Sequence, residues 1–198
     1  MKKILLVAIT ILLSISLNAQ NTMEHLKFKG VLMDGSLNEF VRELKKKGFG
    51  SEERFNDGTT ILYGDFAGHR HCKVIVFAGE SGNVTHLGVS LSDDEHDWGI
   101  LSWQYFDLKE KLITKYGAPY YSFERFNTMY QPDTDGEKIY YARRGDCEYE
   151  TAWKFENGHI KLLISHLRVD YRDYCYVSLI YVDKQNYDLD EDSALDDL

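Results

Sequence analysis

Two histidines separated by one residue, His69 and His71, have the spacing in this chain that most resembles a metal-binding pair. Residues two apart on a β-strand point to the same face, as some zinc ligands do. A third ligand would have to come from His86 on the adjoining strand or from His96 within residues 93–97. Because the sequence contains no complete ligand set, we interpret these histidines as ordinary hairpin residues and predict no metal and no other cofactor.

Nucleophilic chemistry has weak support in the sequence. Cys72 follows His71 directly, but neighbours on a strand point to opposite faces and cannot cooperate as a thiol–imidazole pair. The chain contains no Gly-x-Ser-x-Gly motif and no glycine-rich phosphate loop between a strand and a helix. We therefore predict no catalytic residue and expect a noncatalytic binding or interaction module. The alternative is a metal-dependent protein or enzyme that uses the region of His69 and His71.

An aromatic segment is the strongest candidate for a binding site. Tyr120, Tyr121, Phe123 and Tyr130 flank residues 124–127. Aromatic side chains offer a large contact area at a modest entropic cost, which suits recognition of a protein or a carbohydrate. The alternative is that Phe123, together with Phe126, belongs to the core. These four residues are the predicted binding site.

Two helices are expected. Ser36 followed by Glu39 has the pattern of a capping box, apolar residues then recur every three or four positions, and Gly48 ends the segment. The second helix is expected over residues 100–116, with Gly117 as its stop signal. The remaining ordered segments alternate as strands do, with Asn157-Gly158 as a hairpin turn. The predicted strands are residues 26–32, 59–67, 71–79, 83–92, 137–143, 147–156, 159–168 and 173–182.

The two halves of the chain share a sequence pattern. The letters Glu-Arg-Phe-Asn at residues 53–56 recur at residues 124–127, each time shortly after a glycine that ends a helix. Further on, three residues match at a constant offset of 78: Ile61, Tyr63 and Phe77 with Ile139, Tyr141 and Phe155. The pattern predicts an α+β fold of two tandem helix-plus-antiparallel-meander repeats, residues 20–97 and 98–187, which form a sheet with helices packed on one face.

Both ends of the chain differ from its centre. Two lysines, an apolar run over residues 4–13 and a small residue at Ala19 form the pattern of a secretory signal peptide, residues 1–19. We expect export to the periplasm or beyond, with no membrane insertion after the signal is removed. Residues 188–198 are rich in Asp and Glu, and we expect a disordered acidic tail.

Charge and cysteine content limit the possible partners. The net charge is −9, and it becomes more negative without the two lysines of the leader. Nucleic acid needs clustered Lys and Arg, so we exclude it as a partner. Cys72, Cys147 and Cys175 permit at most one disulfide within a monomer, and we expect buried thiols in the sheet. If a bridge forms, Cys147–Cys175 is the first pair to test.

Two resemblances follow from these patterns. The chain resembles small exported proteins of unknown function from Bacteroidota. The resemblance lies in residues 26–31 and 34–37 and in the end of the leader, residues 17–20. The layout of two helix-plus-meander units is similar to the β-lactamase-inhibitor-protein fold. That resemblance implies two repeats forming one continuous sheet with helices on one face. It concerns topology only and assigns no functional residue.

Overall fold

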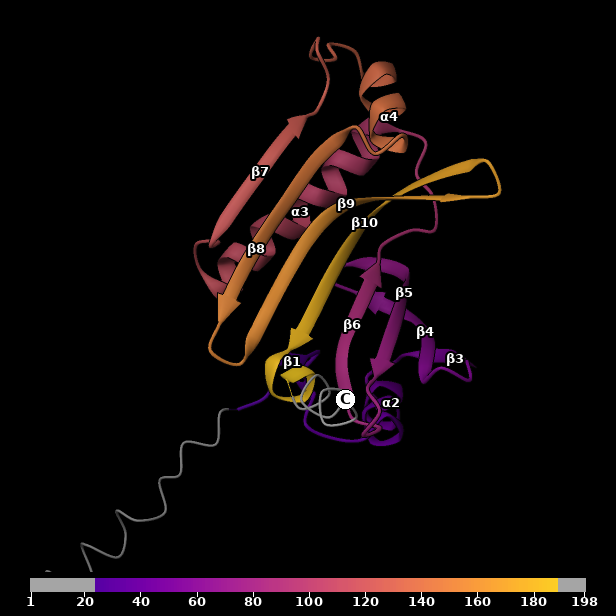
Figure 1. Cartoon of the computed structure of the whole chain (residues 1–198), viewed down its shortest axis with the longest axis vertical. Coiled ribbons are helices and arrows are strands. Elements are labelled where there is room, and N and C mark those ends of the chain that lie inside the picture. Colours follow the sequence, from indigo (N-terminus) through magenta and orange to yellow (C-terminus); the bar gives the residue numbers. More distant parts are fainter. Residues whose placement is uncertain (1–23, 189–198) are drawn as a thin grey trace, which may run out of the picture.

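A computed structural model describes residues 24–188 as an α+β fold, mostly an antiparallel sheet of eight strands with few helices (Figure 1). The predicted signal peptide, residues 1–19, lies outside the described residues. Of the predicted acidic tail, only Asp188 is described. The expected fold class is confirmed at the level of an α+β protein with an antiparallel sheet.

The strands of the large sheet run in the order β3-β4-β5-β6-β10-β9-β8-β7. They are β3 (Gly50–Arg54), β4 (Thr59–Phe66), β5 (His69–Ala78), β6 (Val84–Ser90), β7 (Tyr121–Phe126), β8 (Cys147–Phe155), β9 (Gly158–Val169) and β10 (Arg172–Asp183). The helices are α2 (Leu37–Lys46), α3 (Trp98–Tyr116) and α4 (Asp135–Arg143). A separate hairpin joins β1 (Lys27–Phe28) to β2 (Val31–Leu32).

The sheet consists of two meanders that meet at their last strands. Strands β3 to β6 follow α2 and pair in sequence order, and strands β7 to β10 follow α3 in the same way. The meanders join where β6 pairs antiparallel with β10, from Ser90 opposite Ser178 to His86 opposite Val182. One sheet with two faces therefore extends across both halves of the described chain.

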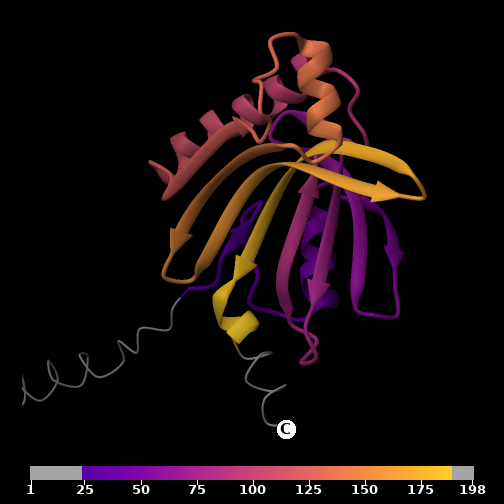
Figure 2. The same cartoon turned by 45° about the horizontal axis from the view of Figure 1, so that its top comes forward.

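One face of the sheet, here called the covered face, packs against the helices. A row of paired residues crosses it and is buried throughout. The row is Thr151, Leu162, Leu179, Val89, Val74 and Leu62, on strands β8, β9, β10, β6, β5 and β4. Tyr105 of α3 contacts this row, with its hydroxyl 2.7 Å from the hydroxyl oxygen of Thr151. Figure 1 shows α3 behind β8 and β9, and Figure 2 shows α2 behind β5 and β6.

The opposite face, here called the uncovered face, carries the next row of paired residues. This row is Tyr121, Ala152, Lys161, Ile180, Gly88 and Ile75. Except for Ala152, these residues are only half-buried. Because successive residues of a strand point to opposite faces, one row packs the core while its neighbour reaches solvent.

Both expected helices are present, and their ends follow from identified caps. The Ser36 hydroxyl accepts a hydrogen bond from the Glu39 backbone N–H, and Gly48 follows the helix with a φ of +94°. Asp97 begins α3 by accepting a bond of 2.9 Å from the Ile100 backbone N–H. These caps satisfy backbone donors that the first turn of a helix leaves unpaired.

The predicted strand over residues 137–143 is wrong, because this segment lies within α4. Thr134 caps the helix by accepting from the Glu137 backbone N–H, and the Glu137 carboxylate accepts from the Thr134 backbone N–H at 3.2 Å. This reciprocal pair is a capping box, and it sets a helix where alternation predicted a strand. Ile139 and Tyr141 are therefore helical, whereas Ile61 and Tyr63 lie in β4. The residues that match at offset 78 thus do not occupy equivalent elements, and the tandem repeat is not confirmed.

Three further segments differ from the predicted elements. The predicted strand at residues 26–32 is the β1–β2 hairpin, which turns at Lys29 and Gly30 with φ values of 52° and 78°. The two edge strands, β3 and β7, were not predicted as strands. An edge strand pairs on one side only and needs less apolar alternation, which removes the usual sequence signal.

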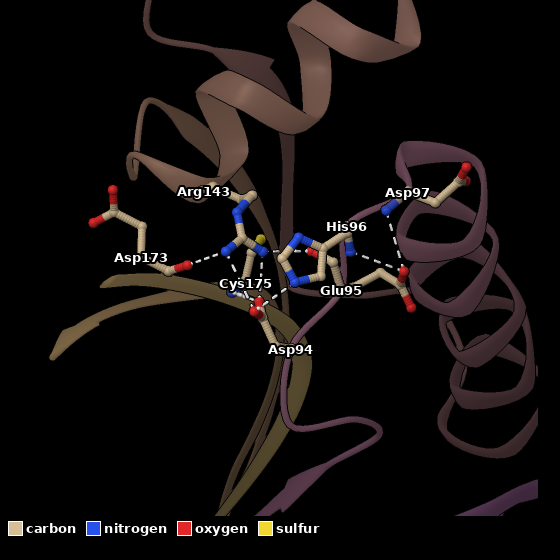
Figure 3. A network of polar contacts seen from close by, with 7 residues as sticks. All are labelled: Asp94, Glu95, His96, Asp97, Arg143, Asp173 and Cys175. Carbon is tan, nitrogen blue, oxygen red and sulfur yellow. Dashed lines mark hydrogen bonds and ion pairs between the residues drawn. The ribbon is translucent and has the colours of Figure 1, made fainter. Parts of the chain in front are cut away.

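A charged network ties α4 to the rest of the molecule (Figure 3). The Arg143 guanidinium donates to both carboxylate oxygens of Asp94 at 2.6 and 3.3 Å, and to the backbone carbonyls of Glu95 and Asp173. Asp94 also accepts a bond of 3.0 Å from the Cys175 backbone N–H. Burial favours a raised pKa for Asp94, but the bonds from Arg143 and Cys175 outweigh it and lower the pKa. The network joins the loop before α3, the end of α4 and strand β10.

We expect Arg143→Ala to destabilise the protein by about 2–3 kcal/mol, because the change removes several hydrogen bonds between charged and partly buried groups. Since folding lowers the pKa of Asp94, its ionised form stabilises the fold at neutral pH, and this contribution disappears as the pH falls through the acid range. Urea unfolding at pH 7 and at pH 3 measures both effects. The matched control is Arg144→Ala at the exposed neighbouring position. An equal loss for both variants would contradict the role given to the network.

Candidate functional site

One concave region of the described chain lies at the end of the sheet where β8 turns into β9. We call it the β8–β9 groove, and its volume is about 1090 Å³. It is lined by Tyr120, Tyr121, Ala152, Trp153, Lys154, Phe155, Glu156, Gly158, His159, Lys161, Val182, Lys184, Tyr187 and Asp188. Lys154, His159 and Val182 are register neighbours on β8, β9 and β10, so the groove opens on the uncovered face.

Two tyrosines form the aromatic wall of the groove. Tyr120 is 73% exposed, and its ring centroid lies 6.0 Å from that of Tyr121. The Tyr121 hydroxyl donates to the Glu150 carboxylate on the neighbouring strand. Desolvation first, and then the nearby Glu150 carboxylate, raise the pKa of Tyr121 to about 12, so its hydroxyl stays protonated at neutral pH. This wall presents a fixed Tyr121 beside an accessible Tyr120.

Positive charge gathers in the same groove. Lys154, Lys161 and Lys184 line it together with His159, whereas the whole chain carries a net charge of −9. Lys161 lies 3.4 Å from the Glu150 carboxylate, but no described acid forms an ion pair with Lys154 or Lys184. Burial lowers the pKa of His159, and the charges of Lys161 and Lys154 lower it further. The described lining therefore carries three lysines against two acids, Glu156 and Asp188, in a protein that is acidic as a whole.

The structure places three of the four predicted binding residues together. Tyr120 and Tyr121 line the groove, and the Phe123 ring lies 5.4 Å from the Tyr121 ring. Tyr130 follows the far end of β7 and is 81% exposed, away from the other three. The alternative core role applies to Phe126, which is buried 5.2 Å from the Trp98 ring, but not to the exposed Phe123.

The predicted pairing of His69 and His71 on one face is wrong. The register of β4 and β5 shifts between Gly64 and Phe66, and His71 has a φ of 55°. This bulge turns His69 into the interior, with its Nε2 3.2 Å from the Asp107 carboxylate, and leaves His71 exposed. Within residues 24–188 there is no group of three or more His, Cys, Asp or Glu residues that could hold a metal ion.

The other candidate ligands have different partners. The His86 ring stacks on Phe77 with centroids 4.3 Å apart, and burial lowers its pKa. His96 pairs with the Asp94 carboxylate at 2.9 Å, within the network of Figure 3. His86 and His96 are thus each accounted for by a local contact.

All three cysteines are free thiols. Cys72 and Cys175 are buried and Cys147 is half-buried, which agrees with the expectation of thiols within the sheet. Burial raises the pKa of Cys147 and of Cys175 to about 12, and it also raises the pKa of Cys72. Because the thiolate is the reactive form, these side chains are poor nucleophiles at neutral pH.

The lysines of the groove were not predicted from the sequence. Lys154, Lys161 and Lys184 are separated in the sequence and form no cluster of basic residues there. Strand pairing alone brings them together. The available signal was the hairpin between β8 and β9. Its actual register sets Lys154 opposite His159 and Phe155 opposite Gly158. A hairpin register therefore would have predicted part of the charge cluster, while Lys184 depends on the longer-range pairing of β10.

The positive potential of the groove can be measured directly through His159. We expect Lys154→Gln to raise the pKa of His159, because it removes a positive charge that disfavours the imidazolium. An NMR titration of the imidazole ring gives this value. Lys138→Gln on α4 is the charge-matched control and should leave the titration unchanged. An unchanged His159 titration in the Lys154 variant would refute the electrostatic description of the groove.

The chain matches no known protein family, no curated protein and no solved structure. The resemblances drawn from the sequence therefore remain predictions. Within the described residues, no helix combines the length and apolar character needed to cross a membrane. Function is inferred below from the geometry of the groove.

Proposed function

We propose that this protein is an exported, noncatalytic module that binds another protein through the uncovered face of its sheet. The β8–β9 groove is the principal contact site. The observation that carries the proposal is the meeting of an exposed aromatic pair, Tyr120 and Tyr121, with Lys154, Lys161 and Lys184 in one groove. Aromatic side chains are enriched at protein interfaces, where polar and charged groups form the rim.

The size and shape of the surface favour a protein over a small ligand. A volume of about 1090 Å³ lies at the top of the range of small-molecule pockets, which is roughly 300–1,000 Å³. The groove also continues into the half-buried row that ends at Ile180, Gly88 and Ile75. Such a strip crosses several strands spaced about 4.8 Å apart and matches the breadth of a protein contact. The positive charge selects a partner that presents carboxylates.

The chemistry of the groove favours binding over catalysis. Its described lining has no Ser, Thr or Cys, and the Tyr121 hydroxyl stays protonated at neutral pH because its pKa is raised to about 12. The alternative, a metal-dependent protein using His69 and His71, has less support because the two side chains diverge at the bulge in β5. Stoichiometric zinc in the purified protein, lost in His69→Ala, would restore that alternative.

Two further parts of the proposal concern origin and location. A helix followed by four strands that pair in sequence order occurs twice, the second time with α4 inserted between β7 and β8. Residues 53–56 and 124–127 each include the last residues of the first of these four strands, which supports a duplicated unit. The leader pattern of residues 1–19 supports export to the periplasm or beyond. The partner is therefore sought among proteins of those compartments or of the cell exterior.

Site-specific photo-crosslinking in the producing cells tests the proposal. A benzophenone amino acid at Tyr120 should give an adduct with a protein, because this side chain is exposed on the rim of the groove. The same substitution at Tyr130 is the control, since Tyr130 is equally exposed but lies outside the groove. Mass spectrometry identifies the adduct, and the purified partner is then titrated against the protein.

The titration completes the test. Tyr120→Ala with Tyr121→Ala should weaken binding of the purified partner at least tenfold, and Tyr130→Ala should leave it unchanged. Lys154→Glu should weaken binding of a carboxylate-bearing partner and reduce its dependence on salt. Adducts with glycan alone, equal adducts at both positions, or no adduct at Tyr120 would each overturn the proposal of a protein-binding groove.

A further inference from the structure

An acidic sequence begins where the groove ends. Strand β10 leads into a helical turn at residues 184–188, and Lys184, Tyr187 and Asp188 of this turn all line the β8–β9 groove. Residues 189–198 follow with the sequence Leu-Asp-Glu-Asp-Ser-Ala-Leu-Asp-Asp-Leu. We call these residues the acidic C-terminal segment. The segment is therefore attached to the described chain at Asp188, a residue that lines the groove.

The base of this turn is firmly fixed. Asp183 is fully buried and accepts hydrogen bonds from the Leu26 backbone N–H at 2.8 Å and from the Asn186 backbone N–H at 3.2 Å. The Asn186 side-chain amide donates to the backbone carbonyls of Met33 and Val84 at 2.6 and 2.9 Å. These buried contacts hold Tyr187 and Asp188 at the groove and determine where the following residues start.

The segment and the groove are complementary in charge and in apolar character. Lys154 and Lys184 form no ion pair with a described acid, and the lysine charges already lower the pKa of His159. The segment supplies Asp and Glu carboxylates, interspersed with leucines that suit the aromatic wall of Tyr120 and Tyr121. The groove thus carries three lysines and two acids, Glu156 and Asp188, whereas the segment that follows carries five acids and no basic residue.

The distances within the fold allow the contact. Lys154 is separated from Val182 by one intervening strand, through His159, which corresponds to about 10 Å across the sheet. Ten residues in an extended conformation span up to roughly 33 Å. A segment tethered at the groove also has an effective concentration in the millimolar range, so a weak contact suffices to occupy the site.

We infer that the acidic C-terminal segment, residues 189–198, binds in the β8–β9 groove of its own chain and competes there with the external partner. The inference rests on the proposed function in taking this groove as the binding site. Carboxylates of the segment pair with Lys154 and Lys184, and its leucines contact the aromatic wall. A partner must displace the segment. The apparent affinity of the partner therefore equals its intrinsic affinity multiplied by the fraction of molecules in which the groove is free.

A labelled peptide added to the full chain tests the inference. The probe is a fluorescein-labelled peptide with the sequence of residues 188–198, followed by fluorescence anisotropy at low salt. The test variant replaces the acids of the segment by amides: D190N, E191Q, D192N, D196N and D197N. We expect this variant to bind the probe at least tenfold more tightly than the unaltered chain, because its own segment no longer competes.

Charge reversal in the groove identifies the binding site. Adding Lys154→Glu and Lys184→Glu to the amide variant should lower probe affinity at least tenfold, whereas Lys47→Glu with Lys138→Glu, an equal change in net charge elsewhere, should have little effect. Equal probe binding by the unaltered chain and the amide variant, no probe binding to either, or equal effects of the two charge reversals would overturn the inference. Its failure is distinguishable from failure of the proposed function, because crosslinking at Tyr120 reports the external partner whether or not the segment binds.

Discussion

The antiparallel pairing of β6 with β10 is the contact on which the rest of the molecule depends. It joins the last strand of each meander, from Ser90 opposite Ser178 to His86 opposite Val182, and makes one sheet from two units. Because the side-chain period of a strand is two, this register decides which residues of both halves share a face. A slip of one residue would move Leu179 and Val177 out of the core and bring Ile180 and Ser178 into it.

One-sided burial is the consequence. The helices lie on the face that carries Leu62, Val74, Val89, Leu179 and Leu162, where full burial of each side chain contributes roughly 1.5–3 kcal/mol. The Arg143–Asp94 network then fixes α4 and the loop before α3 against β10. The opposite face keeps half-buried apolar residues and ends in the β8–β9 groove, where tyrosines and lysines from separate strands meet. The register of the strands therefore determines which side chains meet in the groove.

Sequence reasoning recovered the parts of the fold that have local causes. Ser36 and Gly48 define α2, and alternating apolar residues define β4, β5, β6, β8, β9 and β10. It failed at residues 137–143, where the capping box of Thr134 and Glu137 outweighed an alternating pattern, and at the edge strands, which lack that pattern. Tyr120, Tyr121 and Phe123 could be selected by composition. Lys154, Lys161 and Lys184 could not, because strand pairing alone brings them together, and the bulge at His71 follows from a register shift that no local pattern shows.

Amide hydrogen exchange, measured with and without the protein partner, tests the central claim that the β8–β9 groove is the binding site. Exchange reports protection residue by residue, so it compares the segments of the groove with the helices and with the β9–β10 turn. The account predicts that a bound partner slows exchange at residues 120–121, 152–161 and 182–188 and leaves the β9–β10 turn at residues 170–171 unchanged. Protection confined to the helices or to that turn, with the groove unaffected, would contradict it.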